Sequence, residues 1–403
     1  MNNPLIEILK IKNFQKIWGS QIFSQVTLQM INFIIIINIF ERTHSTTSVS
    51  LIWIFYSLPA IILGPFSGAL VDMISRKKTL IITTLLNSVV VLGFLLIGNK
   101  IYAVYAIIFL YSIINQLYFP AEAATLPSIV SKTLLPAANT IFLFTQYSAF
   151  LIGFGLSGPL LRIAGPKIPF LITSILLILA SLLVSRLPND KILKINTKRF
   201  LMVIGKLREG YHYISQHRNI LAPLLILISV QVVISLFTVI LPSYAVDVLR
   251  IDIRDAGPLL IIPLALGTIG GAILVNRLAG NWRKRKMITY GAFISSFSLI
   301  ILAIIVGFFH EVTILASLIM MLLGAGAVMF IIPTQTFLQE QTPENFRARV
   351  FGTLGFLVIL GSLPPVLFAG AIADLIGVGY ILLLVAIGAF GFGYYVFNKN
   401  DQF

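Results

Sequence analysis

Residues 170–184 read Phe-Leu-Ile-Thr-Ser-Ile-Leu-Leu-Ile-Leu-Ala-Ser-Leu-Leu-Val, a run without a charged side chain. Such runs fill the chain: 58% of its 403 residues are hydrophobic and 11% are charged, whereas soluble domains carry about 25% charged residues. A chain with so little charge must use lipid as its solvent, where only helices and closed barrels satisfy their backbone groups. Barrel strands alternate apolar and polar residues, so these unbroken runs predict an all-α membrane protein.

The charged residues and the missing cysteines exclude several functional classes. The chain has 29 Lys and Arg, 14 Asp and Glu, and a net charge of +15. A soluble protein with this charge would be expected to bind nucleic acid, but here the basic residues gather between apolar runs, as topology signals do. We therefore expect no nucleic-acid partner. Without cysteine, disulfides and thiolate metal sites are excluded. Residues 2–16 are polar and basic and precede a full-length span, so we expect no cleavable signal peptide.

Apolar stretches of about 20 residues, the length that crosses a bilayer, occur twelve times. The longest polar stretch divides them into two sets of six. This predicts an N-terminal six-helix bundle (1–186), a cytoplasmic linker (187–219) and a C-terminal six-helix bundle (220–403). In the linker, residues 200–214 fit an amphipathic helix on the inner leaflet or a flexible connection. The expected spans are 16–40, 47–71, 79–98, 101–121, 138–163, 167–186, 220–246, 256–280, 287–309, 312–338, 346–375 and 377–397.

The basic residues also predict the orientation of the chain. With the N-terminus in the cytoplasm, 23 of the 29 Lys and Arg residues fall in inner segments and 6 in outer loops. Inner loops of membrane proteins carry this excess of positive charge. Both termini are therefore expected to be cytoplasmic.

The two halves of the chain repeat one another. Gly-Ala-Leu-Val-Asp-Met-Ile-Ser-Arg-Lys-Lys at 68–78 is echoed, 208 residues later, by Asn-Arg-Leu-Ala-Gly-Asn-Trp-Arg-Lys-Arg-Lys at 276–286. Each copy follows the second span of its half. Parallel six-helix repeats are one known build of secondary transporters.

The 68–78 segment resembles the signature between the second and third helices of the major facilitator superfamily. Gly68, Asp72 and the basic pair are in place, while Met73 and Ser75 depart from it. Further stretches are similar to the branch that contains enterobactin exporters, macrolide-efflux proteins and lysophospholipid transporters. The resemblance covers essentially the whole chain and implies two pseudo-symmetric bundles around a central cavity. The stretches are Phe119-Pro120-Ala121 with Leu126-Pro127 and Ala138-Asn139; Leu207-Arg-Glu209-Gly210-Tyr211; and Thr342-Pro343-Glu344 with Arg347-Ala-Arg349-Val-Phe-Gly352.

The resemblance implies a conformational latch made by Asp72, Arg76 and Lys77. An acid four residues before a basic pair can form a charged contact at the cytoplasmic mouth of the second helix. This contact would brace the two halves in one state and break in the other, as alternating access requires. The alternative is that the basic residues only fix topology.

Amides and hydroxyls inside the spans are the candidates for substrate binding. In the first span, Gln21, Gln25, Gln29 and Asn32 share one stripe of the helix, and amides facing lipid would be costly. The resemblance implies that the first, fourth, seventh and tenth helices line the central cavity; the alternative is hydrogen bonding between helices. The candidates are Gln25, Gln29, Asn32, Tyr111, Asn115, Gln146, Gln231 and Ser235.

Few titratable groups lie inside the spans. Proton coupling needs one there, and the candidate is Glu122 at the inner end of the fourth span; the alternative is a loop acid beside Lys132. Asp247 and Asp374 fall at expected outer ends, where a solvated helix cap is the simpler interpretation. Proton antiport itself is implied by the resemblance.

No cofactor is expected. The four histidines have no spacing that suits a metal, and no Walker-type loop indicates ATP. No pairing of a nucleophile with a base indicates an enzyme.

These observations predict a secondary active exporter of a small organic compound, such as a siderophore or a drug. It would act as a monomer in the bacterial cytoplasmic (inner) membrane, in contact with membrane lipids, and be driven by protons. A lysophospholipid transporter is the alternative within transport. A non-transporting receptor or scaffold and a membrane-embedded enzyme are disfavoured by the nearly complete signature around Asp72 and by the absence of clustered acids or histidines.

Overall fold

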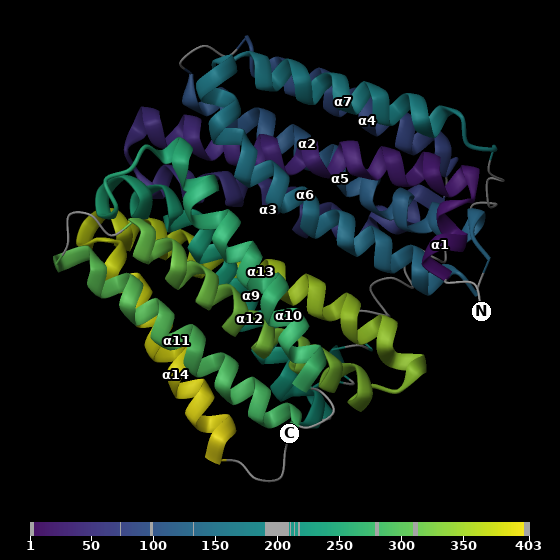
Figure 1. Ribbon diagram of the computed structural model, residues 1–403. Coiled ribbons are helices and arrows are strands. Elements are labelled where there is room, and N and C mark those ends of the chain that lie inside the picture. Colours follow the sequence, from purple (N-terminus) through teal and green to yellow (C-terminus); the bar gives the residue numbers. More distant parts are fainter. Residues whose placement is uncertain are drawn as a thin grey trace. The chain divides into compact units, whose positions relative to one another are not determined.

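The computed structural model describes residues 4–72, 74–96, 100–131, 133–189, 209, 211–212, 214–216, 218–278, 282–308 and 313–398. Their regular structure consists of helices and short helical turns (Figure 1), as the apolar runs predict. The long helices are α2 (Lys12–Thr43), α3 (Thr46–Asp72), α4 (Arg76–Gly93), α5 (Ile101–Ile129), α6 (Leu135–Ala164), α7 (Ile168–Ser185), α9 (Arg218–Ser243), α10 (Ile262–Leu278), α11 (Lys284–Phe308), α12 (Thr313–Gln341), α13 (Glu344–Ile376) and α14 (Val378–Asn398), and a short α1 (Pro4–Leu9) precedes them.

Eleven helical segments of the described chain are long and apolar enough to cross a membrane. They confirm a helical, multi-pass membrane protein. The expected span 79–98 corresponds to α4, which is not among the eleven. Two features lower its hydropathy: it begins with three basic residues, and the face it buries is largely polar, with Thr79, Thr83, Thr84, Asn87 and Ser88.

The chain forms two compact units. Unit 1 consists of Met1–Asn38 and Ile52–Ile204, and unit 2 of Ile39–Leu51 and Gly205–Phe403. The hairpin Ile39–Leu51, which contains the end of α2 and the start of α3, therefore belongs to unit 2, although the rest of both helices belongs to unit 1. The amphipathic helix expected at 200–214 lies mainly outside the described residues.

Unit 1 has an apolar core at the end of the bundle where α1 lies. Phe14 stacks on Trp18 of the same helix with ring centroids 6.2 Å apart, and it also contacts Phe142 of α6. The indole of Trp18 donates to Thr145 Oγ1 at 2.8 Å. Aromatic packing and this hydrogen bond join α2 to α6.

Unit 2 brings helix backbones close together through small residues. A Cβ built on Gly271 of α10 would lie 2.7 Å from the carbonyl oxygen of Ala325 on α12, and one built on Gly291 of α11 would lie 2.7 Å from that of Gly326. Glycines at such positions let membrane helices approach closely. This packing gives α12 a central place, between α10 and α11.

The internal repeat has a structural counterpart. In unit 1, Lys77 at the start of α4 donates from Nζ to the carbonyl oxygen of Leu187, just after α7 ends, at 2.6 Å. In unit 2, Arg285 at the start of α11 donates from Nε to the carbonyl oxygen of Val396 near the end of α14, at 2.9 Å. Lys77 and Arg285 are 208 residues apart, the offset of the repeat. In both units a cation at the start of one helix thus binds a backbone carbonyl at or just after the end of another helix.

One irregular segment was not predicted from the sequence. The expected span 220–246 is α-helical only to Ser243 and continues as a π-helical turn, Tyr244–Val248. The buried Tyr244 donates from its hydroxyl to the carbonyl oxygen of Leu302 on α11 at 3.1 Å. A 3-10 turn (Ile253–Asp255) and a second π-helical turn (Gly257–Ile261) lead into α10. The apolar pattern of the sequence does not distinguish these turns from an α-helix.

Candidate functional site

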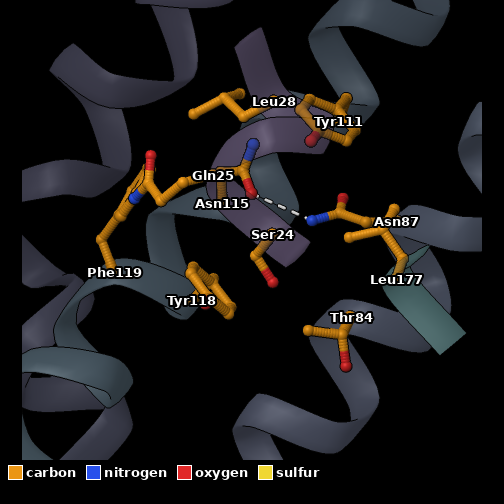
Figure 2. Close-up of a pocket in the computed structure, with 10 residues that line it drawn as sticks. All are labelled: Ser24, Gln25, Leu28, Thr84, Asn87, Tyr111, Asn115, Tyr118, Phe119 and Leu177. Carbon is orange, nitrogen blue, oxygen red and sulfur yellow. Dashed lines mark hydrogen bonds between the residues drawn. The ribbon is translucent and has the colours of Figure 1, made fainter. Parts of the chain in front are cut away.

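Unit 1 contains a small polar cavity among α2, α4, α5 and α7. The space open to the centre of a water-sized molecule is about 10 Å³, which is room for about one water. Figure 2 shows the residues around it. They are Ser24, Gln25 and Leu28 of α2, Thr84 and Asn87 of α4, Tyr111, Asn115, Tyr118 and Phe119 of α5, and Leu177 of α7.

An asparagine pair joins α4 to α5 at this cavity. Asn87 donates from Nδ2 to Asn115 Oδ1 at 2.9 Å (Figure 2), and both side chains are at most 4% exposed. The other two amide atoms, Asn87 Oδ1 and Asn115 Nδ2, have no hydrogen-bond partner among the described residues. The same is true of Gln25 Oε1 and Ser24 Oγ on α2. Because each unpartnered buried polar atom costs about 1–3 kcal/mol, four such atoms around one cavity indicate a site for a polar ligand.

Asn87 differs from the other polar residues on the buried face of α4 in its hydrogen bonding. Thr83 donates from its hydroxyl to the carbonyl oxygen of Thr79, and Thr84 to that of Leu80, each at 2.7 Å. These hydroxyls are satisfied within their own helix. Asn87 instead reaches α5 and keeps one oxygen unpartnered. Asn87 was not among the residues predicted to bind substrate; the signal for it in the sequence is its place in a run of polar residues spaced three to four apart along the expected span.

Glu122 is buried within unit 1. Its side chain is 6% exposed and accepts a hydrogen bond from Tyr118 Oη at 2.7 Å, one helical turn earlier on α5. No ion pair links it to a Lys or Arg of the described chain. The nearby Arg76 donates from Nη1 to the carbonyl oxygen of Ala124 at 2.8 Å. Tyr118 also lines the cavity, so the carboxyl and the polar cavity are joined through one phenol.

Three of the eight predicted substrate-binding residues meet at this cavity: Gln25, Tyr111 and Asn115. Gln25 is buried inside the helix bundle of unit 1. The other five do not line the cavity: Gln29, Asn32 and Ser235 are half-buried, and Gln146 and Gln231 are exposed.

The basic residues of the predicted latch bind backbone carbonyls within unit 1. Besides the contact of Arg76 with α5, Lys77 donates to the carbonyl oxygen of Leu187 and to Asn189 Oδ1 at 3.1 Å. Ser75, where the signature has glycine, caps α4 by accepting from the backbone N–H of Lys78 at 3.3 Å. The side chain of Asp72 lies outside the described residues, so the latch stays a prediction.

Asp374 does more than the solvated cap expected from the sequence. This residue near the end of α13 accepts from the backbone N–H groups of Thr46 and Thr47 at 2.7 and 2.9 Å, and from the hydroxyls of Ser45 and Thr47 at 2.7 Å each. It thus caps the start of α3 from a distant part of the sequence, within unit 2. Beside it in the same hairpin, Glu41 pairs with Arg254 at 2.9 Å. The signal in the sequence was an acid at one span end and a Ser-Thr-Thr run at the start of another.

The comparison with protein families decides the identity of this helical fold. The model of the Major Facilitator Superfamily matches residues 17–364. The chain belongs to this superfamily. It is therefore a membrane transporter by family. The resemblance of its motifs to this superfamily is confirmed.

Similar proteins support this assignment. Macrolide efflux protein A of Streptococcus pyogenes is 26% identical over 388 residues, which cover 92% of each chain. An MFS-type transporter of Bacillus subtilis (strain 168), YfiS, is 23% identical over 354 residues, 86% of this chain and 82% of its own. A crystal structure of an auto-inhibited POT family peptide transporter matches with a TM-score of 0.71 at 15% identity, over 96% of this chain and 97% of that chain. This last likeness shows the fold alone.

Proposed function

We propose that this superfamily transporter is a secondary active exporter of small organic compounds, with macrolide-like drugs as the first substrate class to test. The observation that carries the proposal is the full-length similarity to macrolide efflux protein A, which covers 92% of both chains. No ATP-binding loop occurs in the sequence, so an ion gradient supplies the energy. The amides Gln29, Asn32 and Gln231 favour recognition of the substrate through hydrogen bonds rather than through charge.

The transport cycle would follow alternating access between two six-helix bundles. The bundles are 1–186 and 220–403, joined by the cytoplasmic linker 187–219, with α4 as the twelfth span and both termini in the cytoplasm of a bacterial cell. Asp72, Arg76 and Lys77 form the latch that holds one state. The protein works as a monomer.

Protons drive the export, with Glu122 as the coupling group. Two features support this role: its carboxyl is buried on a membrane helix, and it accepts a hydrogen bond from the uncharged Tyr118. A carboxyl in such a place can carry a proton on one face of the cycle and release it on the other.

The deciding experiment measures export directly. The protein is expressed in a macrolide-sensitive bacterium that lacks its own drug pumps, and the accumulation of a radiolabelled macrolide is measured with and without a protonophore. We expect lower accumulation in expressing cells and loss of this difference with the protonophore. Equal accumulation in the two strains would refute macrolide export.

The same strains then test the other substrate classes. Mass spectrometry of the medium under iron limitation reports export of a siderophore, and movement of a labelled lysophospholipid across vesicles reports lipid transport. A positive result in either assay, with none for macrolides, would replace the substrate class while leaving the transport mechanism in place.

A further inference from the structure

The unpartnered atoms of the cavity in unit 1 match the hydrogen bonds of one water molecule. Gln25 Oε1 and Asn87 Oδ1 need a donor, Asn115 Nδ2 needs an acceptor, and the hydroxyl of Ser24 serves as either. A water offers two donors and two acceptors. If oxygen and nitrogen are exchanged in both asparagine amides, one oxygen and one nitrogen still remain unpartnered. The match therefore does not depend on how the amides are assigned.

The size and the wall of the cavity favour water over an ion or part of a substrate. The space open to the centre of a water-sized molecule is sufficient for about one water. A metal cation would be repelled by the amide N–H of Asn115, and an anion by the oxygens of Gln25 and Asn87. The side chains that α2, α4 and α7 contribute to the wall are uncharged, and the titratable groups of α5 there are Tyr111 and Tyr118.

Tyr118 connects this site to the buried carboxyl. Its ring lines the cavity, and its hydroxyl donates to Glu122 Oε1 at 2.7 Å. The oxygen of that hydroxyl can at the same time accept a proton from the cavity side. Nearby, Arg76 binds the backbone of α5 at Ala124, and Tyr56 of α3 offers its carbonyl oxygen to Ser112.

We propose that the cavity holds one ordered water, bound by Ser24, Gln25, Asn87 and Asn115, and that protons pass between this water and Glu122 through the hydroxyl of Tyr118. A proton that reaches the water converts it to a hydronium ion, whose additional O–H can donate to the phenol oxygen. As the hydronium gives this proton to the phenol oxygen, the phenol gives its own proton to the carboxylate, so the water and Tyr118 are both neutral before and after. In the reverse direction, the carboxyl returns its proton to the phenol oxygen and the phenol proton moves to the water, which is hydronium until that proton leaves the cavity. This inference rests on the proposed role of Glu122 in proton coupling.

Tyr118→Phe tests the path, because it removes the hydroxyl and keeps the ring. Purified protein in liposomes is assayed in two ways: transport of a radiolabelled macrolide driven by a pH gradient, and exchange of labelled for unlabelled macrolide without a gradient. We expect Tyr118→Phe to slow gradient-driven transport at least tenfold and to leave exchange within about twofold. Tyr102→Phe is the matched control, since Tyr102 lies on the same helix but is 71% exposed. It should behave as the unaltered protein.

Two further measurements keep the outcomes distinct. Ser24→Ala removes one binding group of the water with little change in volume, and we expect it to slow gradient-driven transport in the same way. An experimental structure at about 2 Å should show a water within hydrogen-bond distance of the four side chains. A dry cavity, or normal gradient-driven transport by Tyr118→Phe in a protein that Glu122→Gln inactivates, would overturn the relay and leave the role of Glu122 intact. Normal gradient-driven transport by Glu122→Gln would instead overturn the proton coupling itself, and the relay with it.

Discussion

Two neighbouring glycines of α10 allow the packing of unit 2 to be measured with a built-in control. A Cβ at Gly271 would lie 2.7 Å from the carbonyl oxygen and 2.8 Å from the Cα of Ala325 on α12. A Cβ at Gly270 would meet nothing within 4 Å. Gly271→Ala therefore forces a methyl group into the α10–α12 contact, and Gly270→Ala does not.

The comparison of the two variants isolates the cost of that overlap. Each replacement gains up to about 1 kcal/mol in helix propensity, so this gain cancels between them. Carbon atoms pack comfortably at about 3.5–4.0 Å, so the shortfall at Gly271 is roughly 0.7–1.2 Å, and backbone atoms cannot rotate away from it. Overpacking of this kind costs about 1–3 kcal/mol. We expect Gly271→Ala to be less stable than Gly270→Ala by this amount.

The assay is thermal unfolding of the purified protein in one detergent, followed by tryptophan fluorescence and by the fraction that stays monodisperse after heating. The expected difference in stability corresponds to a Tm several degrees lower for Gly271→Ala than for Gly270→Ala. Equal Tm values, or a higher value for Gly271→Ala, would show that α10 and α12 are not in close contact at this point.

Three other perturbations address the remaining contacts. Asp374→Ala should lower stability by about 1–2 kcal/mol, because it uncaps α3, while alanine at the exposed Asp247 should have little effect; equal unfolding temperatures for the two variants would contradict the cap. Asp72→Asn should reduce transport and leave the amount of protein in the membrane near normal, as measured on tagged protein in isolated membranes; undiminished transport would remove the latch. Lys77→Met should lower stability by about 0.5–1.5 kcal/mol, since it leaves the carbonyl of Leu187 without its donor, and thermal unfolding reports the change.

The sequence predicts the helices of this protein well because lipid leaves the backbone few choices. An apolar run such as 170–184 must satisfy its peptide groups internally, so its helical state follows from composition alone. The π-helical turn at Tyr244–Val248 cannot be predicted in this way, because it changes the backbone hydrogen-bond pattern without changing which residues are apolar.

The candidate site was predicted only in part, and the reason is geometric. Polar residues in apolar spans, such as Gln25 and Asn115, are conspicuous because lipid would not tolerate them. Which helices they face depends on packing between distant segments. Asn87 was not predicted, because the sequence does not show that the neighbouring threonine hydroxyls bond within α4 while the amide of Asn87 reaches α5. The partners of Asp374 are still harder to predict, because nothing in the local sequence connects an acid on α13 with the start of α3.

The long separation between Asp374 and its partners also has a consequence for biogenesis. Ser45 precedes Asp374 by 329 residues, and chains grow at about 5–20 residues per second. Roughly 16–66 seconds therefore pass between the synthesis of the hairpin Ile39–Leu51 and the synthesis of the carboxylate that caps it. During this interval the N–H groups of Thr46 and Thr47 must find other partners, such as water or lipid head groups. Capping of this hairpin by Asp374 is thus a late event. In a nascent chain that stops before α13, the hairpin should still be accessible to proteases.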